Sequence, residues 1–265
     1  MTIERQTWHY GLIAQIWAKF LLDTPELPYY QKQIQRFGQP VLDLACGTGR
    51  LLIPFLKSGV DIDGCDISTD MLSLCLERAE QEGLTVQLYE QPMFELDLPR
   101  TYKVIYICGS FGLGGSRQGD LETLKRCFAH LDDGGALVIN IEAEYTFPDA
   151  WQDWLKENRE ALPQPWPEEG NRRVDGEGYV YLSWIRLIAL DPLEQSLIRQ
   201  MRVEKWLGDE LIAREESVLH GRMTFRNELD WMLRLAGFLD IIVQGDYTGE
   251  AVTADHREIV FIARK

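Results

Sequence analysis

The sequence predicts an α/β protein with a doubly wound, mostly parallel sheet of seven strands, a C-terminal antiparallel hairpin and an inserted antiparallel β-meander. Three observations carry this prediction. Between residues 41 and 142, apolar β-branched runs of strand length alternate with helix-length segments, which is typical of a buried parallel sheet. Residues 173–222 alternate with a period of two, as in an antiparallel sheet. Two last strand runs, 239–244 and 258–264, close the chain.

Composition bounds the class of protein. The 265 residues suffice for one elaborated α/β domain or a domain with a sizeable insertion, and the 45% hydrophobic content is that of a globular protein. No apolar run reaches membrane-spanning length, and the first residues lack a signal-peptide pattern. Five unclustered cysteines indicate reduced thiols, so a cytoplasmic location is expected. No C-x-x-C pair or histidine cluster indicates a metal site.

The charge balance limits the partners. The formal net charge is −15, from 42 acidic and 27 basic side chains. Nucleic-acid binding depends on Lys and Arg that meet phosphates, so tRNA, rRNA and DNA are not expected as partners, and neither is a membrane surface. Arg172 and Arg173 form the only short basic pair in the inserted region. A small neutral or cationic molecule fits this balance better.

The N-terminal 40 residues are predicted to be helical. Residues 7–22 place apolar side chains at helical spacing. Pro25 and Pro28 are expected to end that helix. A second helix is expected over residues 29–37, before the first strand.

The most informative stretch is residues 41–50, VLDLACGTGR, which reads as a strand, an acid and a glycine turn, with a helix after it. An open α/β sheet builds a nucleotide site in this way, and Gly47 and Gly49 let the backbone approach a ligand. A dinucleotide fingerprint needs a third glycine where this chain has Leu52, and no P-loop string is present. Asp43 would repel a pyrophosphate and favours a cationic or polar ligand.

The next three strand ends carry further candidates. The strand of residues 60–66 ends in Asp66, 19 residues after Gly47, about where an α/β nucleotide fold places the carboxylate for the ribose hydroxyls. Ser68 then caps a helix. The strand near 85–90 leads to Gln91 and Met93. The strand near 103–109 opens into a glycine-rich loop lined by Cys108, Ser110 and Phe111. Cys108 is a poor nucleophile candidate, because no base lies next to it in sequence.

The remaining elements complete the pattern. A helix near 119–131 and a strand over 136–142 end the parallel part. The inserted region is rich in Trp and Pro over 145–170 and then forms three strands separated by turns. Thr224 is expected to cap the helix of residues 225–235.

This order of acid, glycines, helix, strand, acid and helix resembles the class I S-adenosylmethionine (SAM)-dependent methyltransferases. Their motif I reads [D/E]-x-G-x-G-x-G, and this chain has Asp43, Ala45, Gly47 and Gly49, so alanine replaces the first glycine. A closing hairpin with one antiparallel strand is also characteristic of the family. The resemblance covers residues 38–142 and 224–265 well, whereas the insert matches only in its position after the fifth strand and in its β-rich character.

The resemblance implies SAM as the cofactor and S-adenosyl-L-homocysteine as its product. In the family, the motif I acid lies near the methionine end and the second acid binds the ribose. Many relatives place an Asp for the adenine where this chain has Pro92, which leaves Gln91 and Met93 to meet the ring or merely to shape a loop. The predicted cofactor-binding residues are Asp43, Ala45, Cys46, Gly47, Gly49, Asp66, Ile67, Met71, Gln91, Met93, Cys108, Ser110 and Phe111.

The resemblance also divides the chain by role. Residues 1–40 are expected to form an N-terminal helical cover, and residues 41–144 and 223–265 the SAM-binding core. Residues 145–222 are expected to form a lid that selects the substrate. The lid also offers a surface for a second subunit, so the chain is predicted to be a monomer or a homodimer through the insert.

The implied reaction is methyl transfer from SAM to nitrogen or oxygen of a small molecule by in-line displacement, for which the protein supplies alignment and a dry site. A neutral amine or hydroxyl acceptor needs a proton acceptor. Candidates are Tyr10, His9, Glu142, Glu144, Tyr145 and His220, each of which also has a purely structural interpretation. Two alternatives stay open: a non-catalytic protein that binds SAM or a nucleoside, and a nicotinamide-dependent oxidoreductase, against which Leu52 and the closing hairpin argue.

Overall fold

The computed structural model describes residues 7–265, so the first six residues of the predicted cover lie outside the described part. Two compact units make up this part of the chain. The core unit comprises residues 23–111, 116–146 and 224–265. The insert unit comprises residues up to 22 together with 112–115 and 147–223.

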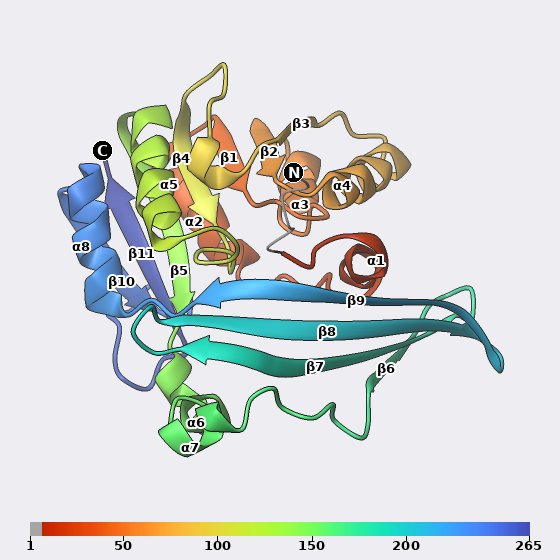
Figure 1. Cartoon of the computed structure of the whole chain (residues 1–265). Helices are drawn as coiled ribbons and strands as arrows, with labels where there is room; N and C mark the ends of the chain where they lie inside the picture. Colours follow the sequence, from red (N-terminus) through yellow and green to blue (C-terminus); the bar gives the residue numbers. More distant parts are fainter. Residues whose placement is uncertain (1–6) are drawn as a thin grey trace. The chain divides into compact units, whose positions relative to one another are not determined.

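The core unit contains the predicted seven-stranded sheet, with the strand order β10-β11-β5-β4-β1-β2-β3 (Figure 1). β1 to β5 are parallel, and β11 is antiparallel to both β5 and β10. This confirms the mostly parallel sheet with a C-terminal antiparallel hairpin. The strands are β1 (Val41–Leu44), β2 (Ile62–Asp66), β3 (Gln87–Glu90), β4 (Tyr102–Ile107), β5 (Leu131–Glu142), β10 (Asp240–Gly245) and β11 (Glu258–Arg264).

Helices cover both faces of this sheet, as a doubly wound fold requires. Successive residues of β4 point to opposite faces: Val104 packs with α2, α3 and α4, whereas Ile105 packs with α5 and α8. The helices are α2 (Leu27–Phe37), α3 (Leu52–Lys57), α4 (Thr69–Gln81), α5 (Arg117–His130) and α8 (Arg226–Ala236), with 3-10 turns η1 (Met93–Glu95) and η2 (Glu144–Thr146).

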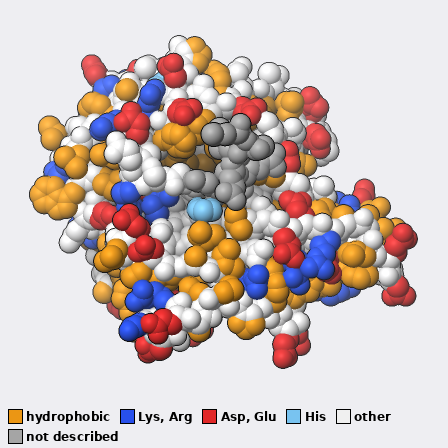
Figure 2. All heavy atoms as spheres, viewed as in Figure 1, with side chains coloured by type: hydrophobic (Ala, Val, Ile, Leu, Met, Phe, Trp, Pro, Cys, Tyr) orange, Lys and Arg blue, Asp and Glu red, His pale blue; other side chains and the backbone are white. Residues whose placement is uncertain are grey.

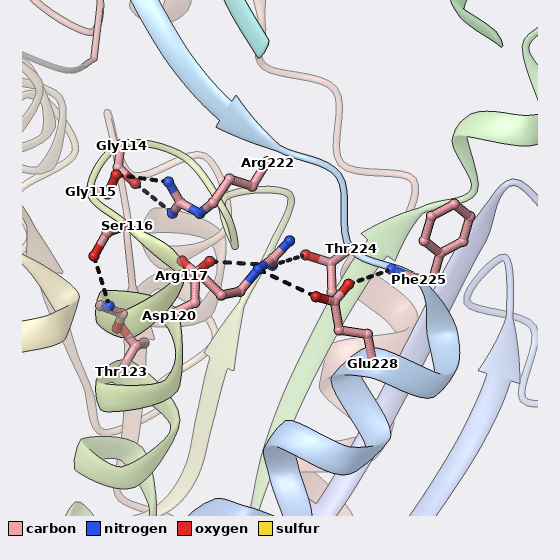
Figure 3. A network of polar contacts seen from close by, with 11 residues as sticks. Gly114, Gly115, Ser116, Arg117, Asp120, Thr123, Arg222, Thr224, Phe225 and Glu228 are labelled. Carbon is pink, nitrogen blue, oxygen red and sulfur yellow. Dashed lines mark hydrogen bonds and ion pairs between the residues drawn. The ribbon is translucent and has the colours of Figure 1, made fainter. Parts of the chain in front are cut away.

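Three helix starts differ from the sequence-based expectation, and α1 (Gly11–Phe20), expected over residues 7–22, begins at Gly11. α2 begins at Leu27, because Pro28 lies in its first turn, where the missing N–H removes no helical hydrogen bond. Thr224 does not cap α8: Phe225 occupies the N-cap position. Thr224 Oγ1 instead accepts a hydrogen bond from Arg117 at 2.8 Å, and Arg117 also pairs with Glu228 at 3.3 Å (Figure 3). Arg117 thereby joins the first turns of α5 and α8.

The insert unit contains an antiparallel sheet in the order β6-β7-β8-β9. The three predicted strands are present, and a fourth, β6, extends them. β6 was missed because its four residues are too few to show an alternating pattern. The elements of this unit are α1 (Gly11–Phe20), α6 (Pro148–Gln152), α7 (Lys156–Glu160), β6 (Asn171–Val174), β7 (Val180–Asp191), β8 (Ser196–Leu207) and β9 (Glu210–Arg222).

Within the insert unit, α1 packs on one face of the sheet and Trp166 lies on the other. Leu12, Ile13 and Ile16 of α1 pack against buried side chains of β7, β8 and β9, and Leu12 N donates to Glu215 Oε2 at 2.8 Å. On the opposite face, the Trp166 ring lies 4.4 Å from the guanidinium of Arg186 and 4.2 Å from that of Arg202. Where β9 ends, Arg222 donates to the carbonyls of Gly114 and Gly115 (Figure 3).

Candidate cofactor site

Asp43 lies where the order of the core sheet reverses. In register it faces Gly64 of β2 and Tyr106 of β4. The chain runs from β1 to β2 on one side, whereas from the neighbouring β4 it runs to β5 on the other side. Open α/β sheets bind ligands at the carboxyl ends of the strands at such a point. Asp43 is 3% exposed, and burial raises the pKa of its carboxyl to about 7. An acid kept partly neutral by burial is stabilised in its ionised form by a cationic ligand.

The two motif glycines serve different purposes. A Cβ added at Gly47 would meet no atom within 4 Å, whereas one at Gly49 would lie 2.6 Å from Cys75 Sγ. Gly47 therefore leaves room beside the loop, and Gly49 lets the loop pack on α4. Ala45, at the position of the family's first glycine, has a φ of 68°, a left-handed conformation that costs an L-residue about 1–2 kcal/mol. Ala45 therefore adopts a backbone conformation in which glycine is favoured.

Asp66 brings two of the predicted loops into direct contact. Its Oδ2 accepts from Gly47 N and its Oδ1 from Ser68 N, both at 2.8 Å. The Ile67 amide also donates to this carboxylate. Since an ionised carboxylate has about four lone-pair sites, one further donor, such as a hydroxyl, remains compatible with these contacts. Burial raises the pKa of Asp66, although the backbone donors act in the opposite direction. The room at Gly47 and the acids at the ends of β1 and β2 fit a cofactor with a cationic part and ribose hydroxyls.

The side chain of Gln91 is engaged within its own loop. Its Oε1 accepts from Asp97 N at 2.9 Å, and its Nε2 donates to Asp97 O at 3.2 Å. These bonds agree with the interpretation that Gln91 shapes a loop. Met71 is buried at 2% exposure, whereas Ile67 is 43% exposed. Contacts of these residues and of Met93 with an adenine stay a prediction.

A polar cluster that sequence reasoning missed joins the glycine loop to the end of β4. Arg50 forms an ion pair with the buried Glu26 and donates to Cys108 Sγ at 3.5 Å. Cys108 Sγ lies 3.4 Å from Glu26 Oε1. Burial raises the pKa of Cys108 to about 12, so the thiol stays protonated at neutral pH, in line with its poor prospects as a nucleophile. No local pattern links these three positions; only the topology does.

Glu142 and Glu258 form a carboxylate pair at the carboxyl end of β5. They lie directly opposite each other on β5 and β11. Burial first, and then the neighbouring Glu142 and Asp246, raise the pKa of Glu258 to about 7. Sequence reasoning named Glu142 and overlooked Glu258. Glu258 lies 116 residues later in the chain, and its position opposite Glu142 follows only from the pairing of β11 with β5.

The remaining base candidates lie in two places. Glu144 and Tyr145 follow β5 in η2, and Tyr145 is 42% exposed. Tyr10, His9 and His220 belong to the insert unit. Burial lowers the pKa of His9 to about 4, so its imidazole is neutral at physiological pH. The choice of a base among these candidates stays a prediction.

Asp43 and Glu258 make the stability of the ligand-free protein depend on pH. Their pKa values are raised from ordinary values of 3.8 and 4.5 to about 7. Because the folded state holds these protons more tightly than the unfolded chain, their contribution to stability is complete below about pH 4 and is lost as pH rises through about 7. We expect Asp43→Asn and Glu258→Gln each to flatten the fall in melting temperature between about pH 4 and pH 7, measured by calorimetry. A variant curve that runs parallel to the wild-type curve would contradict this.

The central part of the core unit is similar to a family of known proteins. Residues 41–135 match a family described as a methyltransferase domain. A protein of Geobacillus sp. (strain WCH70), provisionally named a methyltransferase, is 24% identical over 244 residues, which cover 89% of this chain and 90% of that protein.

Two solved structures are similar over nearly the whole chain. An S-adenosylmethionine-dependent methyltransferase from Clostridium acetobutylicum ATCC 824 has a TM-score of 0.71 at 18% identity, covering 96% of this chain and 97% of its own. A sugar N-methyltransferase from Streptoalloteichus sp ATCC 53650 has a TM-score of 0.67 at 18% identity, covering 100% and 99%. At these identities the likeness shows a common fold.

Proposed function

We propose that this chain transfers a methyl group from SAM to nitrogen or oxygen of a small-molecule metabolite. The match of residues 41–135 to a methyltransferase domain and the fold shared with a SAM-dependent methyltransferase support this proposal. The observation that carries the proposal is the Asp66 carboxylate. It accepts a hydrogen bond from the Gly47 amide at 2.8 Å. This bond joins the acid at the end of β2 to the glycine loop after β1, at the point where the sheet order reverses.

The residues at the carboxyl ends of β1, β2 and β4 each have a role in the proposed reaction. SAM, when bound, supplies an electrophilic methyl group on a sulfonium. Asp43 and Asp66 would hold the cationic and ribose parts, and the open side of Gly47 would admit the cofactor. The turn Cys108–Phe111 would border the methyl group. The chain's own contribution is to bind, align and exclude water.

A small acceptor molecule is supported by the surface charge and by one relative. The chain carries 42 acidic and 27 basic side chains, and on the face shown in Figure 2 the two kinds are interspersed. Nucleic-acid binders instead gather Lys and Arg. One of the similar structures is described as a sugar N-methyltransferase. Of the helices in residues 7–265, none is long and apolar enough to span a membrane. The cytoplasmic location, the insert's role as a lid and a homodimer through it stay predictions.

The first test is stabilisation by ligands. SAM and S-adenosylhomocysteine should raise the melting temperature of the purified protein, since a ligand that binds only the folded state adds about 2.7 kcal/mol at a hundredfold excess over Kd. NADH and ATP serve as controls. A shift with NADH alone would replace the proposal by an oxidoreductase. Binding of SAM without turnover across a panel of amines, amino-sugars and hydroxyl compounds would favour a non-catalytic binding protein.

A further inference from the structure

The turn after β4 depends on a side chain for its backbone hydrogen bonding. β4 pairs with β5 as far as Ile107 and Ile139, so the amide of Gly109 lies beyond the ladder and needs another acceptor. Asn140 supplies it: its Oδ1 accepts from Gly109 N at 2.7 Å. Gly109 has a φ of 67°, a conformation in which glycine is favoured.

The Asn140 carboxamide is in turn oriented by Glu258. A backbone amide only donates, so Oδ1 must face Gly109 and Nδ2 faces Glu258, to whose Oε2 it donates at 2.7 Å. Asn140 is 4% exposed, and a buried amide group without its partner is strongly disfavoured. Glu258 is itself held, because its own amide donates to Asp246 Oδ1 at 2.7 Å. A continuous chain of hydrogen bonds therefore runs from the closing hairpin to the β4 turn.

We propose that Glu258 is a positioning residue: through Asn140 it fixes the Gly109 amide and so holds the turn Cys108–Phe111 in the geometry that binds the cofactor. This inference rests on the proposed function, in which that turn borders the transferable methyl group. The rest of the turn is held by other means, because Cys108 contacts Glu26 and Arg50 and Phe111 is packed in the core. Loss of Glu258 should therefore loosen Gly109 while the fold survives.

The acids around Glu258 disfavour its ionised form, so its contact with Asn140 has to offset them. It faces Glu142 across the strand pair, Asp246 in the β10–β11 turn and, more remotely, Glu26 at the start of α2. The Asn140 donor is thus the contact that favours its ionised form against burial and these like charges. Glutamine at position 258 would keep an acceptor oxygen for Asn140 and would remove the repulsion.

The test uses the full chain with Glu258→Ala, Glu258→Gln and Asn140→Leu. The control is Asp240→Asn, at the other end of the same hairpin, where Asp240 makes an exposed pair with Arg264. Affinity for S-adenosylhomocysteine is measured by titration calorimetry, and exchange of the Gly109 amide by hydrogen-exchange NMR. We expect Glu258→Ala and Asn140→Leu to weaken affinity about tenfold and to speed Gly109 exchange. Glu258→Gln should retain most of the affinity, and Asp240→Asn all of it.

The outcomes separate this inference from the proposed function. If the wild-type protein binds no SAM-type ligand, the proposed function fails and the inference fails with it. If the wild type binds and folded Glu258→Ala binds equally well, the positioning role alone is overturned. Equal losses in Glu258→Ala and Glu258→Gln would also overturn it, because they would show that the carboxylate charge matters rather than the acceptor that orients Asn140.

Discussion

Asp66→Ala is expected to weaken binding of SAM and S-adenosylhomocysteine about 100-fold or more. The variant removes the carboxylate proposed to receive the ribose hydroxyls, and hydrogen bonds to a charged group contribute about 1.5–3 kcal/mol each. It also leaves the amides of Gly47 and Ser68 without the acceptor that each has at 2.8 Å. Titration calorimetry with S-adenosylhomocysteine measures the loss.

A matched control for Asp66 exists near the start of the same strand. Asp61 lies just before β2, and its exposed carboxylate pairs with Arg100. Asp61→Ala should leave the affinity unchanged, since exposed ion pairs contribute about 0–1 kcal/mol to stability and this one lies far from the carboxyl edge. If folded Asp66→Ala binds within threefold of wild type, the assignment of Asp66 to the cofactor is wrong.

Gly49→Ala is expected to destabilise the protein by about 2–5 kcal/mol. Its φ of +78° costs an L-residue about 1–2 kcal/mol. The new Cβ would also lie 2.6 Å from Cys75 Sγ and 3.0 Å from Ile53 Cδ1, and such overpacking adds about 1–3 kcal/mol. Urea unfolding without ligand gives the change in free energy directly.

Gly59→Ala separates the two causes. Gly59 has a φ of +81°, and a Cβ there would meet no atom within 4 Å. This variant should therefore show the conformational cost of about 1–2 kcal/mol alone. Equal destabilisation by Gly49→Ala and Gly59→Ala would mean that α4 yields to the added methyl group and that packing does not require glycine at position 49.

The fold was predictable because its signals are local and agree with one another. Strand-length apolar runs, the glycine turn and the helix cap at Ser68 each follow from short-range preferences, and the structure has the sheet that they predict. Expectations at element ends were less accurate. Pro28 was expected to lie before its helix and is found inside the first turn. Thr224 bonds Arg117 rather than capping α8, because a tertiary partner competes with a local one.

Residues of the candidate site could be predicted only where they lie in the loop directly after a predicted strand. Asp43, Gly47 and Asp66 could be named because each stands at a fixed offset from a strand end. Glu26, Asn140 and Glu258 could not, since their contacts join segments that are adjacent only in the folded sheet. A buried carboxylate that pairs with a distant residue leaves no short motif. The two acids with a pKa near 7 thus include one that sequence reasoning named and one that it did not.

The packing of α1 on β7, β8 and β9 bears on how the chain is made in the cell. Ile16 and Leu219 belong to one apolar cluster, yet a ribosome that adds about 5–20 residues per second needs roughly 10–40 s between them. The apolar face of α1 thus emerges long before the strands that cover it exist. During that interval a nascent chain offers a surface of the kind that chaperones bind. Shortened chains that end before β9 should consequently aggregate or be degraded, because part of the apolar face of α1 stays exposed in them.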